Sequence, residues 1–359
     1  MPSVTIVPLY GHTAPRRRLA HAVAQGTLPA SLLIHGPRGI GKQRLALWLG
    51  QLLLCSGEGE RPCGSCPHCR YTIGLTHPDL RWFFPRPRLT DADATVQEVL
   101  DDYVDAVAER AAQSALYAPP AGTEAIYVAT IRAILHLSVL TPSLARRKVF
   151  VIGDADRMVP QEGAEAAANA FLKLLEEPPV DTTFILTTSE PGALLPTIRS
   201  RVVALRAAPL ADDDVRAFLQ DPTVAAALER TDAPPALEER VRAAAGAPGR
   251  LFGASRGDAD VAARELLAAL PKGDAEWAQA VLRLGGSRAR GFFSEVLDAL
   301  VVLLHQRLRN AALRSDTRAV SASARAIEAV EEMKGRAAGN VSPQLLAAAL
   351  TRPLAESLR

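Results

Sequence analysis

The sequence lacks long apolar runs, a large net charge and a recognisable export signal. No stretch of 18 uninterrupted apolar residues occurs, which argues against a membrane span. The first residues lack the basic start and apolar core of a secretory signal, so we expect a cytoplasmic protein. The formal net charge of +2 indicates nothing about nucleic acid.

Lysine is also scarce, with five residues against thirty-six arginines. A GC-rich genome would produce this bias without any functional cause. We interpret the triplet Arg16-Arg17-Arg18 without a functional role as well, as a solvated helix face rather than a phosphate-binding patch. The 359 residues, 48% of them hydrophobic, are enough for two or three domains with buried cores.

All four cysteines lie within one stretch of fifteen residues, CSGEGERPCGSCPHC, at Cys55, Cys63, Cys66 and Cys69. A reducing compartment disfavours disulfides. Spacings of two residues, in turns rich in Gly and Pro, can direct successive thiolates at one centre. Four thiolates complete a tetrahedral Zn²⁺ shell, which predicts a structural zinc site.

Other interpretations of the cysteines stay open. An iron–sulfur cluster uses similar spacing, but its usual downstream cysteine followed by proline is missing here. Four unligated thiols in a loop are the plainest alternative. His68 is a fifth candidate ligand, although four thiols already suffice.

The stretch GPRGIGKQ at 36–43 matches G-x-x-x-x-G-K-[ST] except at its last position. It follows a short apolar segment, 31–35, which predicts a strand, and precedes apolar residues at helical spacing over 42–54. Backbone N–H groups at such a strand-to-helix turn form an anion site, and Lys42 would reach the terminal phosphates.

Gln43 stands where the motif requires a hydroxyl ligand for Mg²⁺. A second buried strand is predicted at 148–153 and ends in Asp154, which can hold Mg²⁺ through water. Ala155 then takes the place where a hydrolase would carry a water-orienting glutamate. Because phosphoryl transfer depends on positioning and charge, we do not expect this chain to hydrolyse ATP.

Several further motifs carry a family resemblance. HPD at 77–79, NAFLKLLEEPP at 169–179 and LPTIRSRV at 195–202 follow the phosphate loop and the cysteine module in order. Together they resemble the delta-prime subunits of the bacterial DNA polymerase III clamp loader, an AAA+ family. The resemblance covers most of the first 250 residues; the last hundred match only in being helical.

The resemblance implies a subunit of an assembly that opens the sliding clamp and places it on primed DNA. Its expected partners are the gamma/tau and delta subunits, the clamp and DNA within the complex, with no membrane contact. Arg201 matches an arginine that reaches the ATP of a neighbouring subunit, although Val202 replaces the family's usual cysteine. A surface salt bridge is the alternative role of Arg201. The chain would be a non-catalytic stator within the DNA polymerase III holoenzyme.

The resemblance also extends the candidate nucleotide site to the two sensor positions. Structural Zn²⁺ is the expected cofactor, with ATP and Mg²⁺ as further candidates. The candidate nucleotide-binding residues are Gly36, Pro37, Arg38, Gly39, Ile40, Gly41, Lys42, Gln43, Asp154, Ser189 and Arg250. Ser189 falls at the first sensor position and Arg250 near the second; a plain structural role is the alternative for each.

We expect an α/β fold of the AAA+ type, with a RecA-like parallel sheet and flanking helices. Residues 1–207 would form this domain, 208–254 a small helical lid, and 255–359 an all-α collar that oligomerises with neighbouring subunits. A third strand is predicted at 183–187. The segment 85–122 carries apolar residues at helical spacing and predicts an added surface helix.

Two other functions fit parts of the sequence. One is an active clamp-loader ATPase of the gamma/tau kind, which would hydrolyse ATP in isolation. The other is a nucleotide-binding zinc or iron–sulfur protein unrelated to replication, which would not join a clamp loader.

Overall fold

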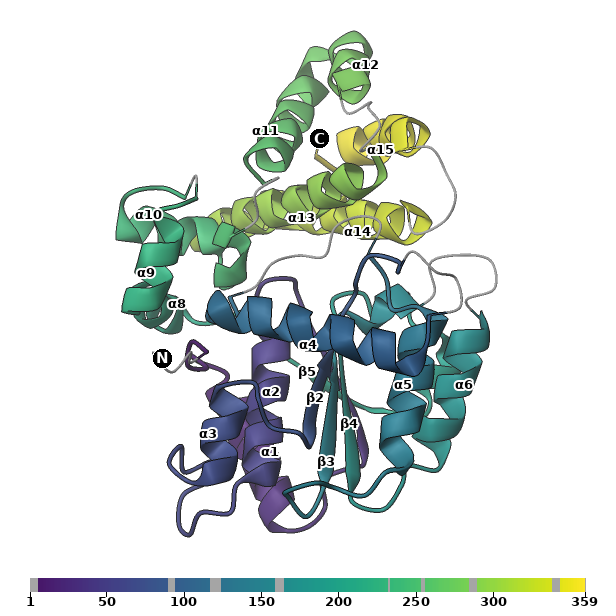
Figure 1. Ribbon diagram of the computed structural model, residues 1–359. Helices are drawn as coiled ribbons and strands as arrows, with labels where there is room; N and C mark the ends of the chain where they lie inside the picture. The colour runs from purple at the N-terminus through teal and green to yellow at the C-terminus, as the bar shows by residue number, and fades with distance from the viewer. Residues whose placement is uncertain are drawn as a thin grey trace. The chain divides into compact units, whose positions relative to one another are not determined.

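The computed structural model describes residues 6–89, 94–116, 124–158, 165–231, 233–252, 256–283, 289–337 and 343–358 (Figure 1). The chain divides into two compact units, Met1–Phe252 and Gly253–Arg359. None of the described helices combines the length and apolar character that a membrane span needs.

A five-stranded parallel sheet forms the centre of the first unit. Its strands are β1 (Ser31–His35), β2 (Leu80–Phe83), β3 (Lys148–Ile152), β4 (Thr182–Thr188) and β5 (Val203–Arg206). They lie in the order β2-β3-β4-β1-β5. This confirms the α/β class expected from the sequence. The three predicted strands are present, and two shorter ones, β2 and β5, were not predicted because four residues carry little periodicity.

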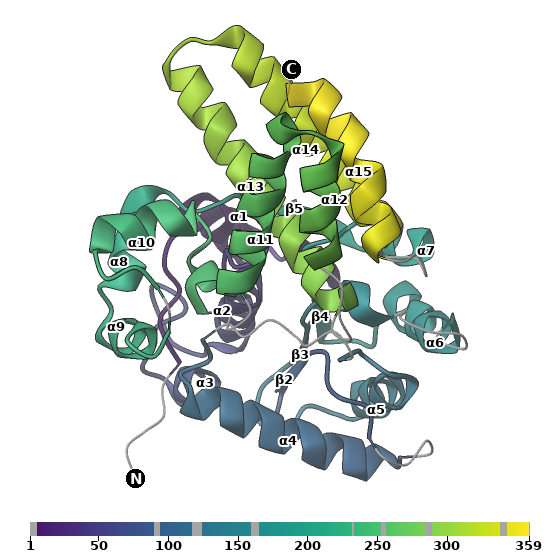
Figure 2. The ribbon, with the colours of Figure 1, turned by 90° about the horizontal axis from the view of Figure 1, so that it is seen from above.

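Helices cover both faces of this sheet. Figures 1 and 2 show α1 and α2 on one face and α5 and α6 on the other. The helical elements that surround the sheet are α1 (Thr13–Ala24), α2 (Lys42–Leu54), α3 (Pro67–Ile73), α4 (Val96–Ala112), α5 (Val128–Val139), η1 (Ala155–Met158), α6 (Glu165–Glu176) and α7 (Pro196–Arg199).

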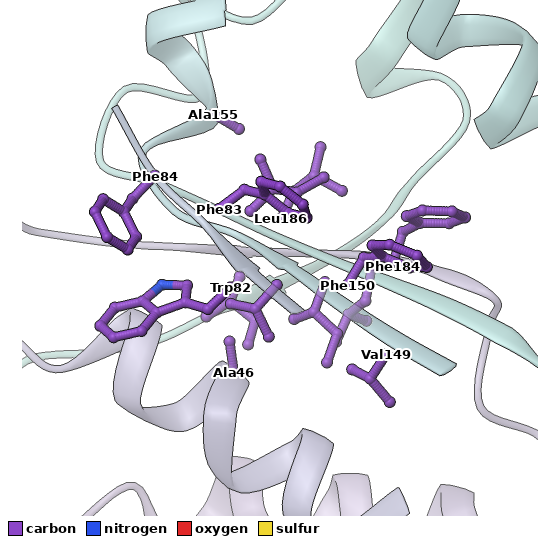
Figure 3. Close-up of a cluster of buried hydrophobic side chains, with 14 of the residues drawn as sticks. Ala46, Trp82, Phe83, Phe84, Val149, Phe150, Ala155, Phe184 and Leu186 are labelled. Carbon is purple, nitrogen blue, oxygen red and sulfur yellow. The ribbon is translucent and has the colours of Figure 1, made fainter. Parts of the chain in front are cut away.

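Aromatic rings tie the strands together through the core. The Phe83 and Phe150 rings stack at 6.4 Å, and those of Phe150 and Phe184 at 5.2 Å, so three neighbouring strands share one aromatic row. Since side chains alternate along a strand, Trp82 lies on the other face, where α2 packs (Figure 3). The sheet is therefore buried on both faces, as parallel sheets are.

The helix expected within 85–122 is α4, and it is more than a surface addition. A capping box between Thr95 and Glu98 starts it. Tyr103, 5% exposed, packs into the core and donates its hydroxyl to the Phe84 carbonyl. Arg86 holds α4 from the sheet side with two hydrogen bonds to Asp102, at 3.0 and 2.8 Å. Residues 90–93 and 117–123 of this segment lie outside the described residues.

A small helical group completes the first unit. It comprises α8 (Asp212–Leu219), α9 (Pro222–Leu228), α10 (Leu237–Ala244) and η2 (Pro248–Phe252). Val215, Leu219, Val224 and Leu228 form its separate core, which also includes Val7 from the N-terminal segment. The chain start therefore ties this helical group to the rest of the unit.

The second unit is all helical. It contains α11 (Arg256–Ala269), η3 (Leu270–Lys272), α12 (Asp274–Arg283), α13 (Ala289–Leu313), α14 (Thr317–Ala337) and α15 (Pro343–Leu358). The apolar stretch 292–308 lies in α13, whose Phe293, Leu297, Leu300 and Leu304 are buried. His305 on the same helix is exposed, so the stretch is not buried all round.

Candidate functional site

The phosphate-loop sequence forms the turn between β1 and α2. Gly36 donates its N–H to the Thr188 carbonyl at 3.3 Å, which joins the loop to β4. A Cβ at Gly36 would lie 2.2 Å from the Ala207 carbonyl oxygen, so only glycine fits there. Gly39 and Gly41 have φ values of +77° and +88°, in the left-handed region that glycine adopts freely.

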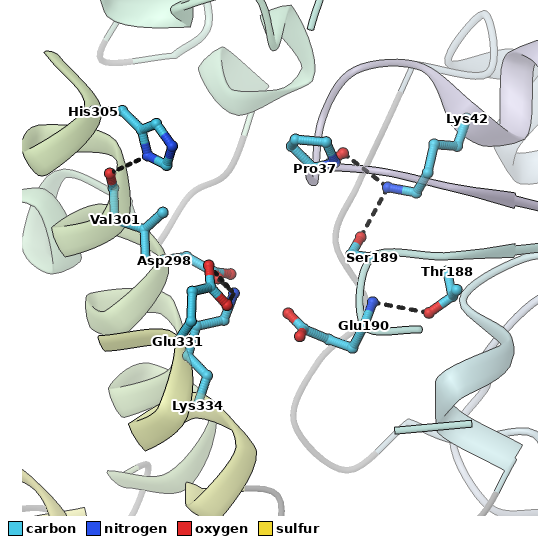
Figure 4. Close-up of polar contacts among 10 residues, drawn as sticks. All are labelled: Pro37, Lys42, Thr188, Ser189, Glu190, Asp298, Val301, His305, Glu331 and Lys334. Carbon is cyan, nitrogen blue, oxygen red and sulfur yellow. Dashed lines mark hydrogen bonds and ion pairs between the residues drawn. The ribbon is translucent and has the colours of Figure 1, made fainter. Parts of the chain in front are cut away.

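The Lys42 ammonium group is held by oxygens of the protein. Its Nζ donates to the Pro37 carbonyl at 2.9 Å and to the Ser189 hydroxyl at 2.8 Å (Figure 4). Burial lowers the Lys42 pKa to about 8, because the charged form loses its hydration. The structure thus brings together Lys42 and Ser189, two residues that the sequence placed in one site.

The Gln43 side chain bridges two groups instead of offering a free ligand. Its Nε2 donates to Asp154 Oδ2 at 2.9 Å, and its Oε1 accepts from Trp82 Nε1 at 3.0 Å. A Cβ at Gly153 would lie 2.5 Å from Gln43 Cδ, so this glycine makes room for the amide. An N–H donor cannot coordinate a cation, and here it occupies the carboxylate that should hold Mg²⁺.

The acidic groups after β3 are also engaged. Asp154 is buried, with φ +47°, and burial raises its pKa. Asp156 accepts a hydrogen bond from the Thr188 hydroxyl at 2.5 Å. Ala155, between them, is 1% exposed and offers no polar group. The site therefore has no carboxylate at the position where a water-orienting one is needed.

The helical group closes over the loop. Gly249 in η2 donates its N–H to the Gly39 carbonyl at 2.8 Å. A Cβ at Gly39 would meet the backbone nitrogen of Arg250 at 2.9 Å, so the two segments are in direct backbone contact. The backbone of Arg250 therefore lies against the phosphate loop at Gly39.

The cavity beside the loop is small. Its volume is about 100 Å³, and its lining includes Tyr10, Ile40, Lys42, Phe218 and Phe252. Pockets for ligands of drug size usually hold roughly 300–1,000 Å³. A nucleotide would therefore need the helical group to move away from the loop.

Helix α4 contributes to the same closure. The Arg110 guanidinium lies 3.5 Å from the Phe84 ring centroid and 4.9 Å from that of Trp82, both cation–π contacts. Arg110 and Leu116 line the cavity. The added helix thus covers the tryptophan that fixes Gln43.

Arg201 lies apart from this loop. Its Nε donates to Glu176 Oε1 at 2.8 Å and its Nη1 to the Thr197 carbonyl at 2.8 Å, and its Nη2 also pairs with Glu176. The Arg201 side chain is 29% exposed and that of Glu176 is 46% exposed. The guanidinium is therefore oriented by α6 and α7 while remaining open to solvent.

The four cysteine sulfurs form one cluster, all within 4.8 Å of one another. The Cys63–Cys69 and Cys66–Cys55 sulfur pairs are 4.0 Å apart. Tetrahedral Zn²⁺ with bonds of about 2.3 Å implies sulfur separations of about 3.8 Å, so the donor set fits the ion. A Cβ at Gly57 would lie 2.5 Å from Cys63 Sγ, which shows how closely the chain wraps the cluster.

The electrostatics of the cluster also favour a cation. A hydrogen bond from the Cys66 backbone N–H, and to a lesser extent hydrogen bonds from Ser65, lower the Cys63 pKa to about 5. Burial instead raises the pKa of Cys69. A bound metal would supply the positive charge that keeps the buried thiol deprotonated. His68 is not among the clustered ligands; its Nδ1 lies 2.9 Å from His77 Nε2.

Sequence reasoning missed the residues that support the site. Trp82 lies in the unpredicted strand β2, and nothing in the sequence links it to Gln43, 39 positions away. His12 Nε2 lies 2.7 Å from the Ile40 carbonyl and so supports the loop from α1's entry. Glu176 belongs to the motif at 169–179, which precedes the motif that contains Arg201. The succession of these two motifs was the sequence signal that could have linked Glu176 to Arg201.

Comparisons with known proteins agree on one family. The sequence model of the family described as DNA polymerase III, delta subunit, matches residues 11–211. DNA polymerase III subunit delta' of Pseudomonas aeruginosa is 33% identical over 172 residues, 48% of this chain and 40% of that protein. The Escherichia coli protein of that name is 30% identical over 249 residues, which are 68% of this chain and 61% of the Escherichia coli protein.

Two further proteins have a lower sequence identity to this chain. DNA polymerase III subunit gamma/tau of Mycobacterium bovis is 29% identical over 190 residues, 53% of this chain and 25% of that protein. A crystal structure of a gamma subunit-related protein from Thermotoga maritima aligns with a TM-score of 0.40 and 17% identity, over 96% of this chain and 99% of it.

The delta' matches span 40% and 61% of those two relatives' own lengths. The family match itself covers more than half of this chain and includes the phosphate loop, the cysteine cluster and Arg201. The chain therefore belongs to the DNA polymerase III delta subunit family and is a delta-prime-like member of it.

Proposed function

We propose that this chain is a non-hydrolysing subunit of the replicative clamp loader. It helps to load the sliding clamp on primed DNA and provides Arg201 to the ATP site of a neighbouring subunit. The gamma/tau and delta subunits are its partners in the cytoplasm, and residues 255–359 form the collar through which it joins them. Its own phosphate loop has a structural role and does not hydrolyse ATP.

The Gln43 bridge carries this proposal. Metal-dependent phosphate transfer needs oxygen ligands around Mg²⁺, with near-octahedral geometry. Here the amide N–H of Gln43 donates to the Asp154 carboxylate, and Trp82 fixes the amide oxygen. Magnesium would have to break both hydrogen bonds, and Ala155 would still leave the attacking water without a base.

The surroundings of Arg201 support a role in trans. Glu176, Thr197 and Ser200 orient the guanidinium, which is 29% exposed and leaves one Nη2 N–H without a protein acceptor among the described residues. The donors now paired with the Glu176 carboxylate can turn to a phosphate group when one approaches. In the isolated chain Glu176 balances its charge. Docking of a neighbour's triphosphate would replace this exposed ion pair, which costs little because such pairs contribute at most about 1 kcal/mol.

The cysteine cluster has a structural role in this proposal. Cys55, Cys63, Cys66 and Cys69 would hold Zn²⁺ with no open coordination position, so the ion supplies cross-linking between the end of α2 and α3.

The experiment compares Arg201→Ala with Arg199→Ala in a reconstituted clamp loader. Both changes remove one exposed positive charge from the same segment, since Arg199 is also exposed. Arginine fingers contribute roughly 10³–10⁵-fold to kcat, so the site that Arg201 serves should lose nearly all turnover. Total ATPase and clamp loading should fall for Arg201→Ala and stay unchanged for Arg199→Ala.

Equal ATPase activity in both variants would contradict the role in trans. The second candidate function, an active gamma/tau-like ATPase, is favoured by the retained Lys42 and by the gamma/tau match. It predicts magnesium-dependent ATP turnover by the isolated chain, abolished in Lys42→Met. That result would overturn the proposed function.

A further inference from the structure

A second and larger cavity lies away from the phosphate loop. Its volume is about 700 Å³, within the roughly 300–1,000 Å³ range of ligand pockets. It lies between the end of α2, the cysteine module and residues 144–147, which lead into β3. The proposed clamp-loader function assigns it no role.

One wall of this cavity is fixed by a buried carboxylate. Asp79, 3% exposed, accepts hydrogen bonds from the backbone N–H groups of Ser143, Leu144 and Ala145 at 2.6–2.7 Å. Burial alone would raise the Asp79 pKa, but these three donors outweigh it and the pKa lies below its usual value. The loop that carries Arg146 and Arg147 is therefore held in one conformation.

The opposite wall is the cysteine module, and the same sequence motif fixes it. His77, two residues before Asp79, is 2% exposed and contacts His68 at 2.9 Å. The Asp79 N–H donates to His77 Nδ1 at 3.0 Å, so the other ring nitrogen, Nε2, carries the proton and donates to His68. The HPD motif thus sets the spacing between both walls.

The lining of the cavity is positively charged. Arg61, Arg146 and Arg147 belong to it together with His68, and its lining residues include no Asp or Glu. Arg61 is engaged at the end of α2, where it donates to the Cys55 carbonyl. Within the described part of the chain, Arg146 and Arg147 have no hydrogen-bond or ion-pair partner.

We propose that this cavity, here named the arginine pocket, binds a phosphate-bearing ligand through Arg146 and Arg147. Two guanidinium groups on a fixed loop suit a multiply charged anion, because each can donate two parallel hydrogen bonds to phosphate oxygens. The phosphate comes either from a free polyphosphate or from a DNA backbone. His68 is the only ring in the lining, so recognition rests on phosphate rather than on base stacking.

The test titrates the full-length chain with tripolyphosphate, without Mg²⁺, by calorimetry, and with a short DNA duplex by fluorescence anisotropy. The decisive variant is Arg146→Ala/Arg147→Ala. Its control is Arg17→Ala/Arg18→Ala, which removes the same charge from two exposed residues of α1. Lys42→Met separates the arginine pocket from the phosphate loop.

We expect affinity for at least one probe to fall tenfold or more in Arg146→Ala/Arg147→Ala and to persist in the control and in Lys42→Met. Loss of tripolyphosphate binding identifies a free anion, and loss of duplex binding alone identifies DNA. Equal affinity in wild type and decisive variant, an equal loss in the control pair, or no binding of either probe would overturn the proposal. Binding of hexaglutamate in place of both probes would also overturn it.

Discussion

The fit between Gly153 and Gln43 predicts a strong energetic coupling between two positions. In Gly153→Ala the new Cβ would lie 2.5 Å from Gln43 Cδ and Oε1 and 2.7 Å from Nε2. Gln43 cannot move aside without losing its hydrogen bonds to Trp82 and Asp154. Two such bonds contribute about 0.5–1.5 kcal/mol each, and overpacking costs about 1–3 kcal/mol.

We therefore expect Gly153→Ala to destabilise the wild type by about 2–4 kcal/mol. In a Gln43→Ser background the three clashing atoms are gone, so the same change should cost less than about 1 kcal/mol. The coupling free energy of the double-mutant cycle should be about 2 kcal/mol. Gln43→Ser alone should be destabilising, because it leaves Trp82 Nε1 without its acceptor.

The assay is urea unfolding of the full chain, carried out in a Trp277→Phe background. Trp277 belongs to the second unit, so fluorescence of the remaining tryptophans then reports on the first unit alone. This separation is needed because two units need not unfold in one step. Gly192→Ala is the matched control, since its Cβ would meet nothing within 4 Å. Equal destabilisation by Gly153→Ala in both backgrounds would show that Gln43 does not limit the space at Gly153.

Two further predictions concern the cysteines and the buried lysine. Cys66→Ser should lower the zinc content measured by atomic absorption from one ion per chain to well below one, since three thiolates remain; retained stoichiometric zinc would exclude Cys66 as a ligand. Because the Lys42 pKa falls to about 8, the unfolded chain binds more protons than the native one between about pH 8 and 10.5. As the pH rises through this range, the free energy of unfolding of the wild type, measured by urea unfolding at each pH, should increase by up to about 3 kcal/mol more than that of Lys42→Met. Parallel pH profiles of the two proteins would contradict the burial of a charged lysine.

Some elements could be predicted from neighbouring residues alone. β1 and β3 are mostly apolar, β4 combines Phe184-Ile185-Leu186 with β-branched threonines, and α2 has helical periodicity, so each could be predicted from a window of neighbours. The cysteine cluster followed from spacing alone, because short turns bring nearby thiols together whatever the rest of the chain does. The sequence also showed that Gln43 and Ala155 depart from a hydrolytic site.

The structural consequences of Gln43 and Ala155 depend on contacts between distant segments of the chain. The partner of Gln43 is Trp82, which lies in a strand of four residues that is too short to show a period. Asp79 meets its backbone donors 64 to 66 positions away, so the arginine pocket is invisible in any local pattern. A local pattern reports which residues an element buries, whereas contacts between elements depend on how distant strands are ordered in the sheet. That order, β2-β3-β4-β1-β5, is what brings residues 43, 82 and 154 into one hydrogen-bonded group.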